Sequence, residues 1–545
     1  MAQIERRGRA SVAVRPLPWA ALGGLLVLPA AVLAARSLAR LVALLGYPYP
    51  HDGLEGTLLH EAKLLRAGEQ IYGPLELHRF VSAPYPPLHP LVLALADIYA
   101  GPHVFWSGRL ISLIAAIAAT ALVAWIVRRT SGSWAAALVG AALFLSAPPV
   151  LLWGSRVKPD VMALCFTAAG LLFISLALDD RYRTTDDRRA TGADDPSILV
   201  VGRRSLVVRH QSSVIGHRSV VFAALCFAGA FFTKQTDVAG PLAAGMALLA
   251  DDVRTWWAGR LPRTLGAPIR PRTAAFALVY LTLALGGWAL LEIATGGGYT
   301  LHVWWNFARL SWWSPGLFRK IAALLDFWWP MMVLSALTLA LAWRRPALLV
   351  PASYVLVSPL TLLLAGEVGA NHNHLLEAHM ALAIAGGCAL GWAFGALAGG
   401  RLSAAPLVVL AALQLWLAFS PPAWYEDQLE PKDPPERFLT FMRSTPGEIL
   451  ADDTGLLFQA GKPLRYDDPS TMGAAARSGA WDQRGLLEDI AARRFSAIML
   501  PLDAEERSRD PSGRWTPEML AAVRAHYRLA FRDRIYTFVP RSDRP

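Results

Sequence analysis

The sequence predicts a mostly α-helical, polytopic membrane protein with a long first external loop and a small external α/β domain at its C-terminal end. The 545 residues are 54% hydrophobic and only 17% charged, whereas soluble domains carry about 25% charged residues. Apolar stretches of about 20 residues, each long enough to cross a bilayer, recur along most of the chain. Basic residues gather in the short loops between these stretches, which is the positive-inside pattern. A soluble enzyme, a disordered tail protein and a collagen-like fibre are therefore excluded.

The charge distribution narrows the class of partner. The chain has 52 basic and 41 acidic residues, a net charge of +11, but from Pro421 onward it has 18 basic against 20 acidic. The excess therefore lies in loops between membrane spans, which argues against a nucleic-acid partner. The three cysteines lie in apolar stretches and are interpreted as small buried hydrophobic residues. They predict neither a disulfide framework nor a thiolate metal site.

About eleven membrane spans are predicted, with the N-terminus in the cytoplasm. Their ranges are 17–35, 109–127, 134–153, 157–178, 220–233, 238–250, 273–293, 329–343, 347–365, 375–397 and 402–419. With this topology every basic cluster between spans falls on the cytoplasmic side. The protein is therefore expected in the cell (plasma or inner) membrane, with its C-terminal domain outside.

The spans define two domains. Residues 1–420 form the predicted transmembrane domain, in which the loop 46–108 is external and the Arg-rich insert 179–218 is cytoplasmic. A second external loop, rich in tryptophan, is expected over 296–327. Residues 421–545 have the composition of a soluble domain and alternate helical with strand-like segments. Helices are predicted over 434–442, 486–494 and 517–527, and strands over 448–451, 497–500 and 534–539.

The string HDGLEG, residues 51–56, contains the most informative carboxylates. Asp52 and Glu55 are three residues apart, so on a helix they share a face. The same spacing, ahead of an apolar run, is close to a helix capping box. The two interpretations are compatible, because a capping Asp remains ionised at neutral pH and can accept a proton as a general base.

Four cations belong to segments that the topology brings to the external edge of the membrane: Arg109, Arg156, Lys158 and Lys234. Each alone is explained as an anchor that extends its charge toward the interface. Their common side is less easily explained in this way, and charges clustered at membrane depth indicate a functional site. A cationic pocket there suits a lipid-linked phosphate, with the carboxylate of Asp52 or Glu55 beside it.

The string GANHNHLLEAH, residues 369–379, opens a late span and allows three interpretations. Its His and Glu side chains could ligate a metal, although the spacing matches no strong zinc signature. Asn371, His372, Asn373 and His374 could instead form hydrogen bonds with a sugar or a phosphate. The third interpretation is polarity at a helix entry.

Taken in order, these motifs resemble the C-type superfamily of membrane glycosyltransferases. The order is HDGLEG, then YPPLHPL, an Arg that opens the second span, RVKPD, a Lys at a hairpin tip, and NHNHLLE. The closer likeness is to bacterial members similar to protein O-mannosyltransferases and lipid A aminoarabinose transferases. The resemblance covers about residues 17–419. The family's acidic motif often has Asp and Glu side by side, whereas here two residues separate Asp52 from Glu55.

The resemblance implies an activity and a role for each motif residue. It implies transfer of a sugar, usually with inversion, from a polyprenyl-phosphate donor to an acceptor hydroxyl on a glycan, lipid or protein outside the membrane. The separation of the two carboxylates leaves open which of them is the base; Asp52 is favoured, with Glu55 orienting the acceptor or supporting Asp52. The cations Lys234, Arg156, Lys158 and Arg109 would hold the donor phosphate. Substrate contacts are expected from Tyr85, Asn371, His372, Asn373, His374 and Glu377. Some members need a divalent ion, so metal dependence stays open, and no other cofactor is implied.

A transporter or flippase for a lipid-linked or charged solute is the alternative. Such a protein would also place charges within the membrane, but at midplane sites on broken helices and often with an inverted repeat. The charges here lie on one side and no repeat is evident. A scaffold whose external domain binds a partner is a third reading, which the acidic first loop disfavours.

Overall fold

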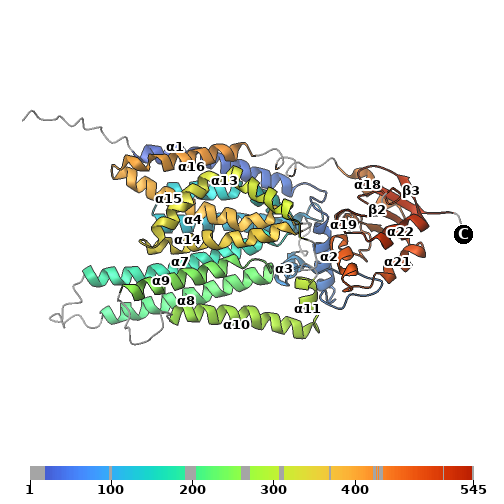
Figure 1. The fold of residues 1–545 in the computed structure, drawn as a ribbon, viewed down its shortest axis with the longest axis horizontal. Coiled ribbons are helices and arrows are strands. Elements are labelled where there is room, and N and C mark those ends of the chain that lie inside the picture. Colours follow the sequence, from blue (N-terminus) through green and yellow to red (C-terminus); the bar gives the residue numbers. More distant parts are fainter. Residues whose placement is uncertain are drawn as a thin grey trace, which may run out of the picture.

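Helices of the membrane domain run side by side and the C-terminal domain stacks on one end of them (Figure 1). The computed structural model describes residues 19–96, 101–190, 204–258, 271–305, 312–367, 370–421, 425, 428, 434–506 and 509–542. The N-terminal arginines and the centre of the predicted cytoplasmic insert lie outside the described residues.

The helical bundle is built from apolar helices that pack as sequential neighbours, such as α7 with α8, and as distant ones, such as α1 with α5 and α13 with α15. The longer helices are α1 (Trp19–Leu45), α4 (Trp106–Ser131), α5 (Trp134–Ser146), α7 (Asp160–Ala190), α8 (Arg204–Thr233), α9 (Ala239–Trp257), α10 (Pro271–Ala294), α13 (Ser314–Ala342), α15 (Leu376–Ala398) and α16 (Ala405–Phe419). Shorter ones are α6 (Pro148–Trp153), α11 (Gly298–Thr300), η2 (Leu301–Trp305), η3 (Pro346–Leu348), α14 (Leu349–Val357), η4 (Ser358–Gly366), η5 (His372–Leu375) and η6 (Leu402–Ala404).

The prediction of about eleven spans is confirmed in part. A helix lies at each expected position, but among the described residues eight are long and apolar enough to cross a membrane. Of the others, α5 and residues 218–233 of α8 are shorter, and α9 carries Asp251, Asp252 and Arg254 near its end. The expected single span 134–153 is divided between α5 and α6, because Pro148 and Pro149 cannot continue a helix.

Two expected loops contain more helix than the sequence indicated. The tryptophan-rich segment 296–327 was expected to be a loop, but α13 already begins at Ser314, with Pro315 in its first turn. Proline is favoured there because its fixed φ suits a helix start and its missing N–H would have no partner. Helix α7 likewise continues to Ala190 and α8 begins at Arg204, so much of the insert 179–218 extends these two helices.

The C-terminal domain is a four-stranded mixed sheet with helices around it, which confirms the predicted α/β class. The strand order is β1-β2-β4-β3; β1 and β2 are parallel and the other two pairings are antiparallel. Its elements are α18 (Glu436–Ser444), β1 (Glu448–Ala451), α19 (Thr454–Gln459), α20 (Pro469–Arg477), α21 (Arg484–Ala491), β2 (Phe495–Leu500), α22 (Pro517–His526), β3 (Tyr527–Phe531) and β4 (Tyr536–Pro540). The sequence missed α19, α20 and β3.

Helices α2 (Leu54–Arg66) and α3 (Leu88–Ala96) lie between the bundle and the C-terminal domain (Figure 1). The segment that contains them packs into that domain's core. Phe80 is fully buried there against Trp481, with ring centroids 4.9 Å apart. Its amide donates to the carbonyl of Arg465, and its own carbonyl accepts from the amide of Asp467. The first loop and the C-terminal domain therefore share one hydrophobic core, and the site lies at their junction with the bundle.

Candidate active site

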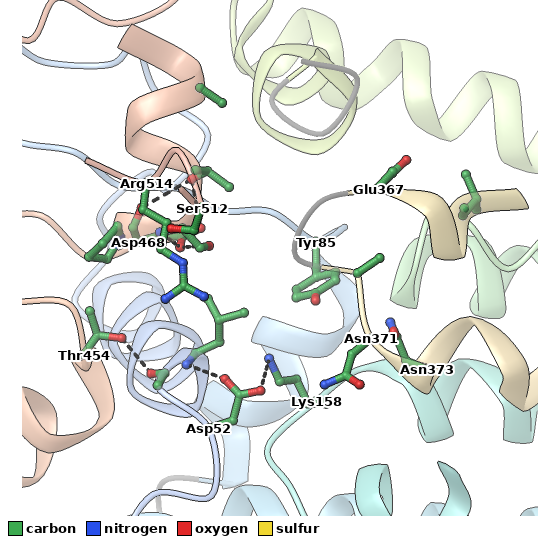
Figure 2. Close-up of a pocket in the computed structure, with 18 of the residues that line it drawn as sticks. Asp52, Tyr85, Lys158, Glu367, Asn371, Asn373, Thr454, Asp468, Ser512 and Arg514 are labelled. Carbon is green, nitrogen blue, oxygen red and sulfur yellow. Dashed lines mark hydrogen bonds and ion pairs between the residues drawn. The ribbon is translucent and has the colours of Figure 1, made fainter. Parts of the chain in front are cut away.

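A cavity of about 660 Å³, lined by many charged and polar side chains, opens where the bundle, the first loop and the C-terminal domain meet (Figure 2). This size lies within the range of small-molecule binding sites. The first loop contributes Asp52 and Tyr85, and the bundle contributes Lys158 and Lys234. The bundle side also contributes Gln235, Trp304, Glu367, Asn371, Asn373 and His374, and the C-terminal domain contributes Asp452, Asp453, Thr454, Asp468, Arg477, Ser512 and Arg514.

Asp52 lies just before α2, with its carboxylate directed toward Lys158 (Figure 2). Its Oδ2 is 3.4 Å from Nζ of Lys158 and 4.0 Å from a guanidinium nitrogen of Arg156. Its Oδ1 accepts the amide hydrogen of Leu54 at 2.9 Å. Burial opposes ionisation, but Lys158 and Arg156 together lower the pKa of Asp52 to about 2. With 28% of its side chain exposed, Asp52 is an ionised carboxylate that a substrate can reach.

Glu55 has a different environment three residues later. Its side chain and that of Arg109 are both fully buried, and the two form a bidentate ion pair with distances of 2.9 and 2.8 Å. Glu55 also accepts the amide hydrogens of Val157 and His51. Although burial opposes it, Arg109 lowers the pKa of Glu55. The capping box suggested by the spacing is not formed, because α2 is capped by Gly53 without a side-chain hydrogen bond and Glu55 accepts instead from the amide of His51. Neither Glu55 nor Arg109 lines the cavity.

Lys234, at the tip between α8 and α9, lines the cavity beside Asp160, the first residue of α7. Nζ of Lys234 is 2.6 Å from Oδ1 of Asp160. The same oxygen accepts a hydrogen bond from Nδ2 of Asn373 at 2.9 Å. A lysine that is paired once retains further N–H donors, so Lys234 can contact an anionic ligand without leaving Asp160.

The remaining predicted residues divide between the cavity and its surroundings. Tyr85, Asn371, Asn373 and His374 line it, whereas Arg156, His372 and Glu377 do not. The Nδ1 atom of His372 lies 2.8 Å from Oδ1 of Asn371. Glu377 is buried in the bundle and accepts a hydrogen bond from the hydroxyl of Tyr354. In the described ranges no group of three or more His, Cys, Asp or Glu side chains has the geometry of a metal site.

Sequence reasoning missed the wall that the C-terminal domain supplies. The string ADDTG, residues 451–455, has the composition of a turn, and Asp453 caps α19 by accepting from the amide of Leu456. The same residue lines the cavity, and burial raises its pKa to about 6. Asp452 beside it accepts from Arg514 and from the indole of Trp515. Local sequence carries no sign that this turn faces Asp52, roughly 400 positions earlier.

Comparisons with known proteins agree with this architecture. The model of the dolichyl-phosphate-mannose-protein mannosyltransferase family matches residues 85–185, which include Tyr85, Arg109, Arg156 and Lys158. No curated protein matches the chain by sequence.

Solved structures share the fold at low sequence identity. ArnT from Cupriavidus metallidurans in the apo state is 14% identical with a TM-score of 0.55, over 95% of this chain and 98% of that chain. The archaeal oligosaccharyltransferase AglB from Archaeoglobus fulgidus, in complex with an inhibitory peptide and a dolichol-phosphate, is 12% identical with a TM-score of 0.52, over 95% and 75%. An oligosaccharyltransferase from the same organism, tethered with an acceptor peptide, is 13% identical with a TM-score of 0.51, over 91% and 72%.

The bundle, the cavity and these matches together define a multi-pass membrane glycosyltransferase. Within this class the resemblance predicted from the sequence is confirmed: the family model that matches is that of the protein mannosyltransferases, and the fold is similar to that of ArnT and AglB.

Proposed function

We propose that the protein transfers a sugar from a polyprenyl-phosphate-linked donor to an acceptor hydroxyl at the external face of the membrane. The observation that carries the proposal is that the carboxylate of Asp52 and the ammonium groups of Lys158 and Lys234 line the same cavity. The AglB structure with a dolichol-phosphate supports a lipid phosphate as the donor's carrier.

The reaction is a direct displacement at the anomeric carbon. Asp52 removes the proton of the acceptor hydroxyl, and the oxygen forms a bond to the anomeric carbon while the bond to the phosphate oxygen breaks. The polyprenyl phosphate leaves with that electron pair, and Lys158 and Lys234 stabilise its negative charge. Because a phosphate is already a good leaving group, no strong general acid is needed.

Lys158 connects donor binding to the strength of the base. Lys158 lies 3.4 Å from Asp52 and, together with Arg156, holds the pKa of that carboxylate low, which makes Asp52 a weak base. A bound phosphate attracts the same ammonium group. Asp52 then loses part of this stabilisation and accepts a proton more readily when the donor is in place.

The other predicted residues have supporting roles. Arg109 and Glu55 tie the backbone before Asp52 to the start of α2 after it, because Arg109 donates to the carbonyls of Tyr47 and Tyr49 and also pairs with Glu55. Arg156, which lies against the ring of Trp153, adds positive charge behind Lys158. The wall from Asp452 to Thr454 faces the acceptor, which is a glycan, a lipid or a protein.

Purified protein incubated with radiolabelled polyprenyl-phosphate sugars tests the proposal. We expect protein-dependent release of polyprenyl phosphate together with a labelled acceptor product. Movement of intact donor across a proteoliposome membrane without cleavage would contradict the transferase and support a transporter.

A further inference from the structure

Four buried polar atoms at the bundle side of the cavity have no hydrogen-bond partner in the described part of the chain. They are Oδ2 of Asp160, Oε1 of Gln235, Oδ1 of Asn373 and Nε1 of Trp304. Gln235, Asn373 and Trp304 line the cavity, and Asp160 lies directly behind, in contact with Asn373. Buried polar groups are almost always paired, so four unpaired atoms in one place point to an absent ligand.

The orientation of Gln235 is fixed by its own contacts. Its Nε2 donates to the carbonyls of Pro84 and Val303, at 3.2 and 2.9 Å. Both amide hydrogens are thereby used, which identifies the other amide atom as the oxygen. Only 4% of the residue is exposed, so this oxygen is a buried hydrogen-bond acceptor at the cavity wall, without a donor in the described part of the chain.

Asn373 is oriented in the same manner. Its Nδ2 donates to Oδ1 of Asp160, which also accepts from Lys234. Two donors therefore converge on one oxygen of Asp160, while its second oxygen and the oxygen of Asn373 have none. Because both donors share one acceptor oxygen, two acceptor oxygens of this cluster have no donor among the described residues.

Trp304 supplies the complementary group. Its ring stacks on that of Trp288 with centroids 5.3 Å apart and planes 7° apart, so its position is held by packing. Its indole N–H is buried and has no acceptor among the residues that the structure describes. An unpaired buried N–H lowers stability by an amount that a bound hydroxyl oxygen would recover.

We propose that Gln235, Asn373 and Trp304 form the subsite for the sugar ring of the donor and select a polyhydroxylated sugar that carries no negative charge. A sugar hydroxyl both donates and accepts, so it can satisfy the amide oxygens and the indole N–H together. A carboxylate only accepts hydrogen bonds and would face these oxygens without a shared proton. The inference rests on the proposed function and deepens it, since it concerns the sugar rather than the lipid phosphate.

Trp304→Phe removes the N–H but keeps an aromatic ring against Trp288. Its matched control is Trp328→Phe, because the indole N–H of Trp328 is also buried and unpaired but lies within α13, away from the cavity. The probes are undecaprenyl phosphate alone and undecaprenyl phosphate carrying mannose, glucose, galactose, arabinose or glucuronate. Binding to each is measured in nanodiscs, with the thermal midpoint recorded for each variant.

We expect the wild type to bind at least one of the four neutral sugar lipids more tightly than the bare lipid, and the glucuronate lipid no more tightly than the bare lipid. Trp304→Phe should weaken binding of the preferred sugar lipid by roughly 3- to 10-fold, leave binding of the bare lipid unchanged and keep or raise the thermal midpoint. Trp328→Phe should change neither affinity.

Equal weakening of both lipids by Trp304→Phe, no weakening, or a preference of the wild type for glucuronate would overturn the subsite. These outcomes leave the proposed function standing. Failure of the wild type to bind even undecaprenyl phosphate would instead contradict the proposed function, and the subsite with it. The comparison of neutral with glucuronate lipids needs only the wild type, so it decides the question even if Trp304→Phe does not fold.

Discussion

Asp52 and Glu55 show how one short string can hold an accessible carboxylate and a buried, structural one. Asp52 keeps part of its surface open and is paired loosely with Lys158, at 3.4 Å. Glu55 is sealed, with two bonds from Arg109 and two from backbone amides. The first can exchange its partner for a substrate, and the second holds the loop that presents the first.

The Arg109–Glu55 pair should therefore matter for folding more than for binding phosphate. Replacing one partner leaves a buried charge without compensation, which costs about 3–5 kcal/mol. We expect Arg109→Met and Glu55→Gln each to lower the thermal midpoint sharply, and the double variant to recover part of the loss. If Arg109→Met kept its thermal midpoint but no longer bound the donor, Arg109 would instead hold the phosphate.

The sequence predicted which side chains lie near one another at the site, but not which carboxylate pairs with which cation. Asp52, Lys158, Lys234 and Asn373 do line one cavity, because hydropathy and charge brought their segments to the same edge. The spacing of three residues could not distinguish Asp52 from Glu55. What distinguishes them is Arg109, which lies 54 positions beyond Glu55, and no local pattern records that contact.

Among the secondary-structure elements, the contact between α2 and α19 positions Asp52, the proposed base. The α2 backbone at Gly56 lies so close to α19 that a Cβ there would be 2.3 Å from the carbonyl oxygen of Thr454. The hydroxyl of Thr454 donates to the carbonyl of Gly53, which follows Asp52. The close approach therefore anchors the start of α2 to the C-terminal domain.

We expect Gly56→Ala to separate these helices and to destabilise the protein by about 1–3 kcal/mol, as overpacking of a close contact does. Thermal unfolding and resistance of the C-terminal domain to limited proteolysis measure the effect. Gly286→Ala in α10 is the matched control, because a Cβ there meets nothing within 4 Å and alanine favours a helix. Equal thermal midpoints for the two variants would argue against the anchor.

The elements themselves were largely predictable and their docking was not. Apolar stretches predicted the order of the membrane helices. The strand-like segments after residue 421 predicted three of the four strands to within a few residues of their observed positions. The packing of α2 against α19 joins segments that are some 400 positions apart, so it leaves no periodicity in either. The start of α13 at Ser314 was missed because its first turns contain Pro315, Gly316, Arg319 and Lys320 and are therefore not uniformly apolar.

At the scale of the whole molecule, the junction between the first loop and the C-terminal domain contains buried carboxyl groups. Glu61 of α2 and the pair Asp467 and Asp468 are each at most 1% exposed. Burial raises the pKa of Glu61 and of Asp467 well above the ordinary range, and the charge of Asp468 adds to the effect. Lys158 and Arg79 act in the opposite direction, on Glu61 and Asp467 respectively, but do not reverse it.

This junction should loosen as pH rises. Above the ordinary pKa values of 4.5 for Glu61 and 3.8 for Asp467, the folded state holds more protons than the unfolded chain. Stability therefore falls with increasing pH through this window. We expect Glu61→Gln to flatten the decline of the thermal midpoint between about pH 5 and pH 8 and to raise it at the upper end. A slope identical to that of the wild type would show that Glu61 does not hold a proton there.

The proposed displacement mechanism depends on Asp52 acting as the base in a cavity that it shares with Lys158. The most direct test is the turnover of purified Asp52→Asn with a lipid-phosphate sugar that the wild type consumes, with Asp482→Asn, an exposed residue outside the cavity, as the control. Removal of a general base predicts a loss of about 10²–10⁴-fold in a protein that remains folded at the assay temperature, while the control keeps wild-type turnover. The thermal midpoint of Asp52→Asn should fall, because Lys158 and Arg156 lose the charge of Asp52. Transfer by Asp52→Asn near the wild-type rate would contradict the mechanism.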